Sequence, residues 1–104
     1  ISGVNEEGSE PGKVYVILNE KNAPLGIVGF DYILGPTAYL VFALSPKYWG
    51  LDIMSRALHE FLQKHGKPYR NIIARVKDSN EPALKLIRKL PFKIQIELLI
   101  SSNY

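Results

Sequence analysis

Hydrophobic residues gather in five short runs along the chain, and the length and residue types of each run are typical of β-strands. The runs cover residues 13–19, 25–34, 38–44, 71–77 and 92–100. Short turns that contain Pro with Asn or Gly separate the first three runs, which predicts an antiparallel meander. The third run, AYLVFAL, is almost wholly apolar, so we expect a central strand that is covered on both faces.

Two further segments space their apolar residues by three and four positions, which predicts amphipathic helices. The first helix is expected from about residue 51 to residue 65, and Gly66 ends it. Its apolar stripe consists of Leu51, Met54, Leu58, Phe61 and Leu62. The second helix follows the capping residues 78–80 and extends to about residue 90. Its inward-facing residues are predicted to be Ala83, Leu86, Ile87 and Leu90.

The predicted order is therefore β-β-β-α-β-α-β, a mixed sheet of the α+β class. Because a helix joins the third strand to the fourth, these two strands should run parallel in a right-handed crossover. Residues 1–12 are rich in Gly, Glu and Ser and are predicted to form a flexible arm. Residues 13–104 are predicted to form a single domain, as the length of 104 residues suggests.

Composition removes several classes of function. The chain has no cysteine and only two histidines, so neither disulfides nor a metal centre is expected. No apolar run approaches the roughly 18 residues that a membrane span needs, and no signal peptide is visible, so we expect a soluble, cytoplasmic protein. The net charge of +3 suits an anionic ligand but lacks the dense basic patch of a nucleic-acid-binding protein.

Residues 45–58 carry the end of a strand, a turn with Pro46 and Gly50, and the start of a helix. Such a turn presents free backbone N–H groups and is a common phosphate site. The segment reads Pro46-Lys-Tyr48-Trp49-Gly50-Leu-Asp52-Ile-Met54, followed by Ala57-Leu58, and a second motif runs from Asn80 to Phe92. Together these motifs resemble the GNAT N-acetyltransferase superfamily over residues 13–100. The closest branch acetylates the N-termini of ribosomal proteins.

The resemblance implies that acetyl-CoA lies between the third and fourth strands, which splay apart. It implies that main-chain groups of the third strand pair with the pantetheine arm, and that the amides of the turn and helix start hold the pyrophosphate. It also implies a hydrogen bond from Asn80 to the CoA arm, with Phe92 closing the core beside the cleft. The cofactor-binding residues carried over in this way are Val41, Phe42, Ala43, Leu44, Trp49, Gly50, Leu51, Asp52, Ile53, Met54, Ser55 and Asn80.

Two positions of the turn depart from the family pattern. Asp52 stands where the family has Gly, and Met54 stands where it has Gly or Ala. A carboxylate a few ångströms from a phosphate costs on the order of 1–4 kcal/mol, depending on solvation. In the alternative interpretation, Asp52 stabilises the start of the helix through the helix dipole and Met54 belongs to the core stripe. Both interpretations stay open at the level of sequence.

Catalytic residues are not defined by the sequence. Where many GNAT enzymes have a Tyr general acid, this chain has Ile87, although an aliphatic residue is usual in the ribosomal branch. Asp31 and Ser79 are weak candidates for a catalytic role. In the alternative interpretation, Asp31 is a solvent-facing strand residue and Ser79 is a helix cap. Ser45 is a further polar candidate. The two histidines, His59 and His65, are expected to be structural.

The family builds the wall that binds the acceptor from a strand and two helices that precede the strand at residues 13–19. We expect this wall to have been lost or cut away here, or to come from a partner subunit, for example in a homodimer. The favoured function is an acetyl-CoA-dependent N-acetyltransferase that acts on an amine, either a protein N-terminus or a small amine. The alternative is a catalytically inactive GNAT-fold module that binds a protein or CoA. A nucleic-acid-binding domain is the least favoured, with Lys77, Lys85, Arg88, Lys89 and Lys93 as its contacts.

Overall fold

The computed structural model describes residues 9–50 and 52–100. Along the chain the elements are β1 (Ser9–Pro11), β2 (Val14–Leu18), β3 (Pro24–Leu34), β4 (Thr37–Leu44), the 3-10 turn η2 (Pro46–Tyr48), α1 (Ile53–His65), β5 (Asn71–Lys77), α2 (Glu81–Lys89) and β6 (Gln95–Leu99). In this part of the chain neither helix has the length and apolar character to cross a membrane.

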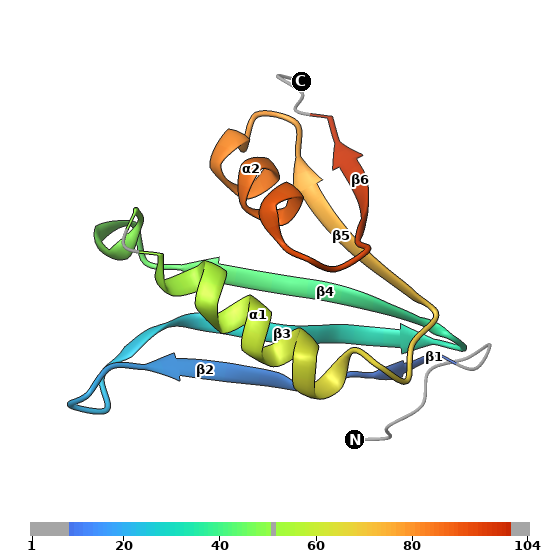
Figure 1. Ribbon diagram of the computed structural model, residues 1–104, viewed down its shortest axis with the longest axis horizontal. Helices are drawn as coiled ribbons and strands as arrows, with labels where there is room; N and C mark the ends of the chain where they lie inside the picture. The colour runs from blue at the N-terminus through green and yellow to red at the C-terminus, as the bar shows by residue number, and fades with distance from the viewer. Residues whose placement is uncertain (1–8, 51, 101–104) are drawn as a thin grey trace.

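The six strands form one mixed sheet in the order β1-β3-β4-β5-β6, and β2 pairs with β3 along the same edge as β1. The first strands pair antiparallel, whereas β4, β5 and β6 run parallel (Figure 1). This arrangement confirms the predicted α+β class and the order of the seven expected elements. Backbones approach closely at two glycines of β3. A Cβ atom at Gly26 would lie 2.2 Å from the carbonyl oxygen of Ala43, and one at Gly29 would lie 2.3 Å from that of Lys13.

The structure differs from the flexible arm expected at residues 1–12 in the last residues of that segment. Residues 9–11 form strand β1, which pairs with Tyr32–Leu34 of β3. The N–H of Gly12 then donates a hydrogen bond to the carbonyl oxygen of Asp31 at 3.1 Å, which continues the edge into β2. Sequence alone missed this strand because backbone pairing, rather than an apolar pattern, defines it. The flexibility expected of residues 1–8 falls outside the described residues.

Both helices pack on the same face of the sheet (Figure 1). The expected stripe of α1 is confirmed for its four described members, which are all buried: Met54, Leu58, Phe61 and Leu62. In α2, Ala83, Ile87 and Leu90 are buried as expected, whereas Leu86 is half-buried and packs against the edge of the core, and Leu84 is a further buried residue. The difference matters because Leu86 lines a cavity, as described below.

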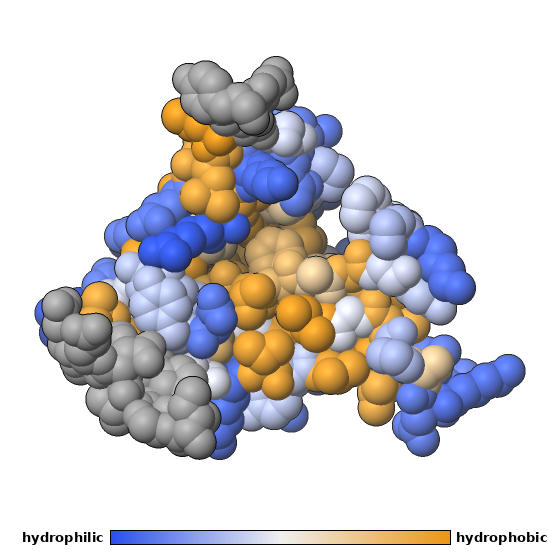
Figure 2. All heavy atoms as spheres, turned by 180° about the vertical axis from the view of Figure 1, so that it is seen from behind, coloured by the Kyte–Doolittle hydropathy of each residue, from blue (hydrophilic) through white to orange (hydrophobic). Residues whose placement is uncertain are grey.

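Within the described residues no helix lies on the opposite face of the sheet, and apolar side chains gather over the middle of that face (Figure 2). On β2, Tyr15 packs against Phe61 of α1, and therefore the alternating residues Val14 and Val16 face the other way. Their side chains are 45% and 57% exposed. The second apolar side of β4 lies on this uncovered face. Among the described residues helices therefore cover only one face of β4, which differs from the expected covering of both faces.

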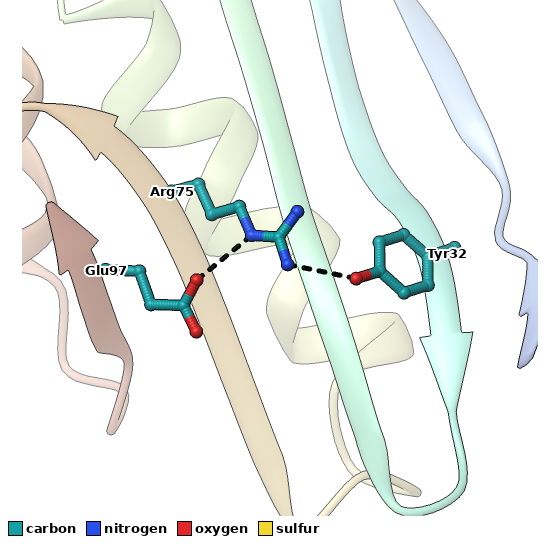
Figure 3. A network of polar contacts seen from close by, with 3 residues as sticks. All are labelled: Tyr32, Arg75 and Glu97. Carbon is teal, nitrogen blue, oxygen red and sulfur yellow. Dashed lines mark hydrogen bonds and ion pairs between the residues drawn. The ribbon is translucent and has the colours of Figure 1, made fainter. Parts of the chain in front are cut away.

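A polar and aromatic cluster ties four strands together on the uncovered face. Arg75 of β5 bonds Glu97 of β6 at 3.0 Å and donates a second hydrogen bond to the hydroxyl of Tyr32 on β3 at 3.1 Å (Figure 3). The Arg75 guanidinium also lies 4.6 Å from the ring centre of Tyr39, which stacks on Tyr32. The hydrogen bond with Tyr32 raises the pKa of Tyr39, and the hydrogen bond with Glu97 raises the pKa of Arg75.

Candidate functional site

Strands β4 and β5 are paired along only half of their length. Residues 37–40 of β4 pair with residues 71–74 of β5, and the register ends at Leu40 and Ala74. Beyond that point the two strands diverge, as Figure 1 shows. The splayed pair of parallel strands predicted from the sequence is therefore confirmed.

Two residues of β4 direct their main-chain N–H and C=O groups toward the opening. The N–H of Ser45 donates to Leu25 on β3 at 2.9 Å, so Ser45 faces β3. Because the hydrogen-bonding direction alternates along a strand, the N–H and C=O of Phe42 and Leu44 point away from β3. Those of Val41 and Ala43 point toward β3 and are occupied by the sheet. Of the four β4 residues predicted to pair with a pantetheine arm, only Phe42 and Leu44 therefore present main-chain groups to the opening.

The opening holds a cavity of about 570 Å³ between the end of β4, the start of α1 and one side of α2. Its lining combines aromatic, aliphatic and charged side chains, and the residues are Phe42, Ala43, Leu44, Tyr48, Trp49, Gly50, Asp52, Ile53, Met54, Ser55, Asn80, Pro82, Ala83, Lys85, Leu86 and Lys89. Ten of the twelve predicted cofactor-binding residues are in this lining. Val41 is not, and Leu51 lies outside the described residues.

The turn at the mouth of the cavity is held by a tryptophan. Pro46 opens η2, and Trp49 follows it with its indole N–H donating to the carbonyl oxygen of Leu44 at 2.8 Å. That carbonyl points toward the opening, where β5 no longer offers a donor, so the indole takes the place of a strand partner. The side chain of Trp49 stays 59% exposed. Gly50 follows with a positive φ of 82°, a conformation that glycine adopts without strain.

Asp52 is the N-cap residue of α1, but it does not act as a cap. Its side chain makes no capping hydrogen bond, and its backbone is left-handed, with φ 62° and ψ 13°. The interpretation in which Asp52 stabilises the helix start thus finds no support in a capping contact. A left-handed backbone costs most residues about 1–2 kcal/mol and costs glycine almost nothing. The Gly that the family has at this position therefore suits the backbone as well as a ligand.

Met54 fits both of its interpretations. It is buried at 7% exposure and belongs to the core, and it also lines the cavity. The first N–H groups of α1 have no partner within the helix, as at any helix start. The Asp52 side chain leaves them uncapped, and Ile53 and Ser55 in this first turn line the cavity.

The α2 side of the cavity begins at Asn80. Its side-chain oxygen accepts a hydrogen bond from the N–H of Ala83 at 3.3 Å, which caps α2. The side-chain amide N–H₂ does not take part in the cap, and Asn80 also lines the cavity. Two lysines, Lys85 and Lys89, complete this side. Sequence analysis named both only as contacts of a nucleic-acid-binding domain, although their spacing of four already puts them on one side of the helix.

The remaining candidates lie elsewhere. Neither Asp31 on β3 nor Ser79 before α2 lines the cavity, and both side chains are exposed. Among the lining residues Asp52 carries the only carboxylate. His59 lies edge-on to Phe92 with ring centres 5.4 Å apart, and His65 stacks on Tyr15 at 5.5 Å. These two histidines therefore contact aromatic rings outside the cavity.

Ser45 is half-buried beside the cavity but does not line it. Phe92 packs against the main core, as expected, and is likewise absent from the lining. Tyr48, Pro82, Ala83 and Leu86 are lining residues that sequence reasoning did not assign to binding. Tyr48 stood in the quoted motif, so the motif itself was the signal that could have found it.

The chain was compared with known families, curated proteins and solved structures. Residues 3–93 match the sequence model of a family described as the acetyltransferase (GNAT) domain. Neither the curated proteins nor the solved structures gave a significant match. The matched span covers most of the chain and includes every described residue that lines the cavity.

Proposed function

Since the chain belongs to the GNAT acetyltransferase domain family, we propose that it is an acetyl-CoA-dependent N-acetyltransferase whose cofactor lies between β4 and β5. The acceptor would be an amine, either a protein N-terminus, as in the ribosomal branch, or a small amine. The family match supports acetyl transfer in general. The observation that carries the rest is the cavity, because it opens where β4 and β5 part and is lined by the turn that follows β4.

The lining suits acetyl-CoA in three respects. A volume of about 570 Å³ lies within the range of roughly 300–1,000 Å³ that is usual for small-molecule sites. Phe42 presents unpaired main-chain groups to an extended amide chain, and the start of α1 together with two lysines suits phosphate. The carboxylate of Asp52 opposes phosphate. The fit is therefore good for the pantetheine arm and weakened at one point for the phosphates.

Acetyl-CoA supplies the acetyl group as a thioester, which an uncharged amine can attack directly. The N–H of Phe42 is the donor that we assign to the thioester carbonyl oxygen, because charge builds up on that oxygen during the attack. The cavity walls hold the reacting atoms close together, which contributes without any acid or base. The amine nitrogen bonds to the carbonyl carbon, the carbon–sulfur bond breaks, and the proton lost by the amine ends on solvent or on the released thiol.

The cavity lining offers few groups that could act as a general acid or base. Among the residues that the structure describes, Asp52 is the only carboxylate in the lining, and neither histidine lines the cavity. The acceptor should therefore arrive already deprotonated. The rate of transfer should then rise with pH along the titration of the amine itself. An N-terminal amine, with a pKa of about 8, should be favoured near neutral pH over a lysine side chain at about 10.4.

A catalytically inactive binding module is the second candidate, and the same shortage of acids and bases favours it. Asp31 and Ser79, the two candidate catalytic residues, do not line the cavity. In this alternative the cavity binds CoA or a protein segment and no transfer follows. The acceptor side could also be completed by a partner subunit, including a second copy of this chain.

The single tryptophan provides a direct assay. Trp49 is the only Trp in the chain and lies at the mouth of the cavity, so its fluorescence should change when acetyl-CoA binds. Titration with acetyl-CoA tests binding, and mass spectrometry of a peptide with a free N-terminus tests transfer. Saturable binding with an acetylated peptide supports the enzyme. Binding without product, at any pH up to about 9, supports the inactive module, and no binding at millimolar acetyl-CoA contradicts both CoA-based functions.

A further inference from the structure

Charge is distributed unevenly around the cavity between β4 and β5. The α1 side contributes one carboxylate, from Asp52, whereas the α2 side contributes two ammonium groups, from Lys85 and Lys89. Both lysines are exposed, and neither forms an ion pair with another described residue. The described lining residues therefore carry two cations and one anion, and both cations are on α2.

We propose that Lys85 and Lys89 form the phosphate-binding side of this cavity, so that the phosphates of CoA are held from α2 rather than by the turn before α1 alone. This inference rests on the proposed binding of acetyl-CoA. It differs from the expectation drawn from sequence, in which the amides of residues 50–55 hold the pyrophosphate. The reason for the difference is Asp52, which places a negative charge beside those amides.

The position of the two lysines on α2 supports this role. They are four residues apart and therefore lie one above the other on the same side of the helix. Pro82 and Leu86 line the cavity from that side as well, which fixes its orientation. Two like charges at this spacing repel each other, and a bound phosphate removes that repulsion.

Other roles for the two lysines predict different behaviour. Lys89 lies in the last turn of α2, where a cation stabilises the helix dipole, but so does Arg88. Arg88 does not line the cavity and is exposed. It is therefore a suitable control, because it shares the helix and the sign of charge with both lysines and the last turn with Lys89, but does not line the cavity.

The experiment measures CoA affinity by Trp49 fluorescence in the 104-residue chain. The variants are Lys85→Gln, Lys89→Gln, the double variant and Arg88→Gln; glutamine has a helix propensity close to that of lysine. Each lysine variant should weaken CoA binding about tenfold, as expected for loss of one charge-assisted contact, and the double variant should weaken it further. Arg88→Gln should stay within about twofold, since exposed charges away from the ligand are screened.

Pantetheine, which has no phosphate, provides the second arm. Its affinity should be the same in wild type and in the double variant. If pantetheine loses as much affinity as CoA, the lysines shape the cavity rather than bind phosphate, and the inference is wrong. The inference is also wrong if the lysine variants bind CoA as tightly as wild type does. That result would leave the proposed function intact.

A third arm uses a short single-stranded RNA, because a basic helix can also bind a nucleic-acid backbone. Under the proposal RNA binds weakly and CoA displaces it. RNA that binds more tightly than CoA, and whose binding is weakened equally by Arg88→Gln and the lysine variants, would overturn the assignment. If wild type binds no CoA at all, the proposed function fails and this inference fails with it.

Discussion

The two halves of β4 have nearly the same composition and opposite surroundings. In the first half, residues 37–40 pair with β3 on one edge and with β5 on the other, and Ala38 and Leu40 are buried. In the second half, β4 keeps β3 but loses β5, and Phe42 and Leu44 are only half-buried. A row of apolar side chains is thus core at one end and the wall of a cavity at the other.

Each strand remains paired on its far edge where the two diverge. Strand β4 pairs with β3 as far as Leu44, and β5 pairs with β6 as far as Lys77. The carbonyl of Leu44, which would otherwise face β5, accepts the indole N–H of Trp49. A parallel pair of strands can therefore open when other donors replace the missing ladder, and the opened backbone groups become available to a ligand.

The largest effect should come from emptying the closed half. Leu40 and Leu44 lie on the same strand and, by the alternation of β4, on the same face. Leu40→Ala should lower the free energy of unfolding by about 2–5 kcal/mol, because Leu40 is only 5% exposed within the core. Leu44→Ala should cost clearly less, since its surroundings are already open. Urea unfolding of both variants measures the difference, and equal losses would contradict the contrast between the two halves.

Asp52 at the start of α1 should affect ligand binding most. Asp52→Gly removes a carboxylate and a left-handed non-glycine residue together, so CoA affinity should rise about tenfold and stability by about 0.5–1 kcal/mol. Asp52→Asn removes the charge but keeps a side chain that tolerates the left-handed region. It should therefore raise CoA affinity and leave stability nearly unchanged. Calorimetric titration and thermal unfolding separate the two effects, and an unchanged affinity in both variants would show that phosphate does not approach Asp52.

Substitution of Trp49 tests whether the indole contact stabilises the half of β4 that does not pair with β5. Trp49→Phe keeps an aromatic ring and removes the N–H that bonds Leu44, so unfolding should become easier by about 1 kcal/mol. CoA affinity, measured by calorimetry because the fluorophore is gone, should fall as the turn loses its anchor. Lys47→Gln is a suitable control, since Lys47 lies in the same turn but does not line the cavity. A variant that loses no stability would mean that the indole contact is dispensable.

The smallest effect is expected at the cluster on the uncovered face. The folded-state pKa of Tyr39 is raised, largely by its hydrogen bond with Tyr32, so folding favours the protonated phenol. The corresponding stability is fully present below the usual tyrosine pKa of about 10 and is lost as pH rises through the raised value. Tyr32→Phe should lower the pKa of Tyr39 and leave CoA affinity unchanged. NMR titration of the tyrosine ring carbons measures the shift; an unaltered Tyr39 titration would rule out the assigned cause.

Sequence reasoning succeeded where one local signal was sufficient. The spacing of Met54, Leu58 and Leu62 specifies an amphipathic helix, and α1 has that stripe. The strand at residues 71–77 was predicted with its exact bounds, because Asn71–Lys77 is a β-branched run between clear turn residues. The motifs around Trp49 and Asn80 indicated the family before the fold was known, and the family match over residues 3–93 agrees.

Sequence reasoning was incomplete where the answer depends on contacts between distant segments. Strand β1 exists through its pairing with β3, and no pattern within residues 9–11 announces it. Lys85 and Lys89 belong to the cavity because α2 lies beside the opening, a placement that a helical wheel does not contain. In the same way, which main-chain groups of β4 face the opening follows from its register with β3.

The strand–turn–helix at residues 45–58 shows both kinds of information. Its sequence by itself determined a Pro-led turn, a helix start and the position of Asp52, because these depend on neighbouring residues along the chain. Only the tertiary structure decided that the Asp52 side chain leaves α1 uncapped, that Trp49 bonds Leu44, and that two lysines from α2 lie on the far wall. Those facts depend on how β4, β5 and α2 pack, and packing is a property of the whole chain.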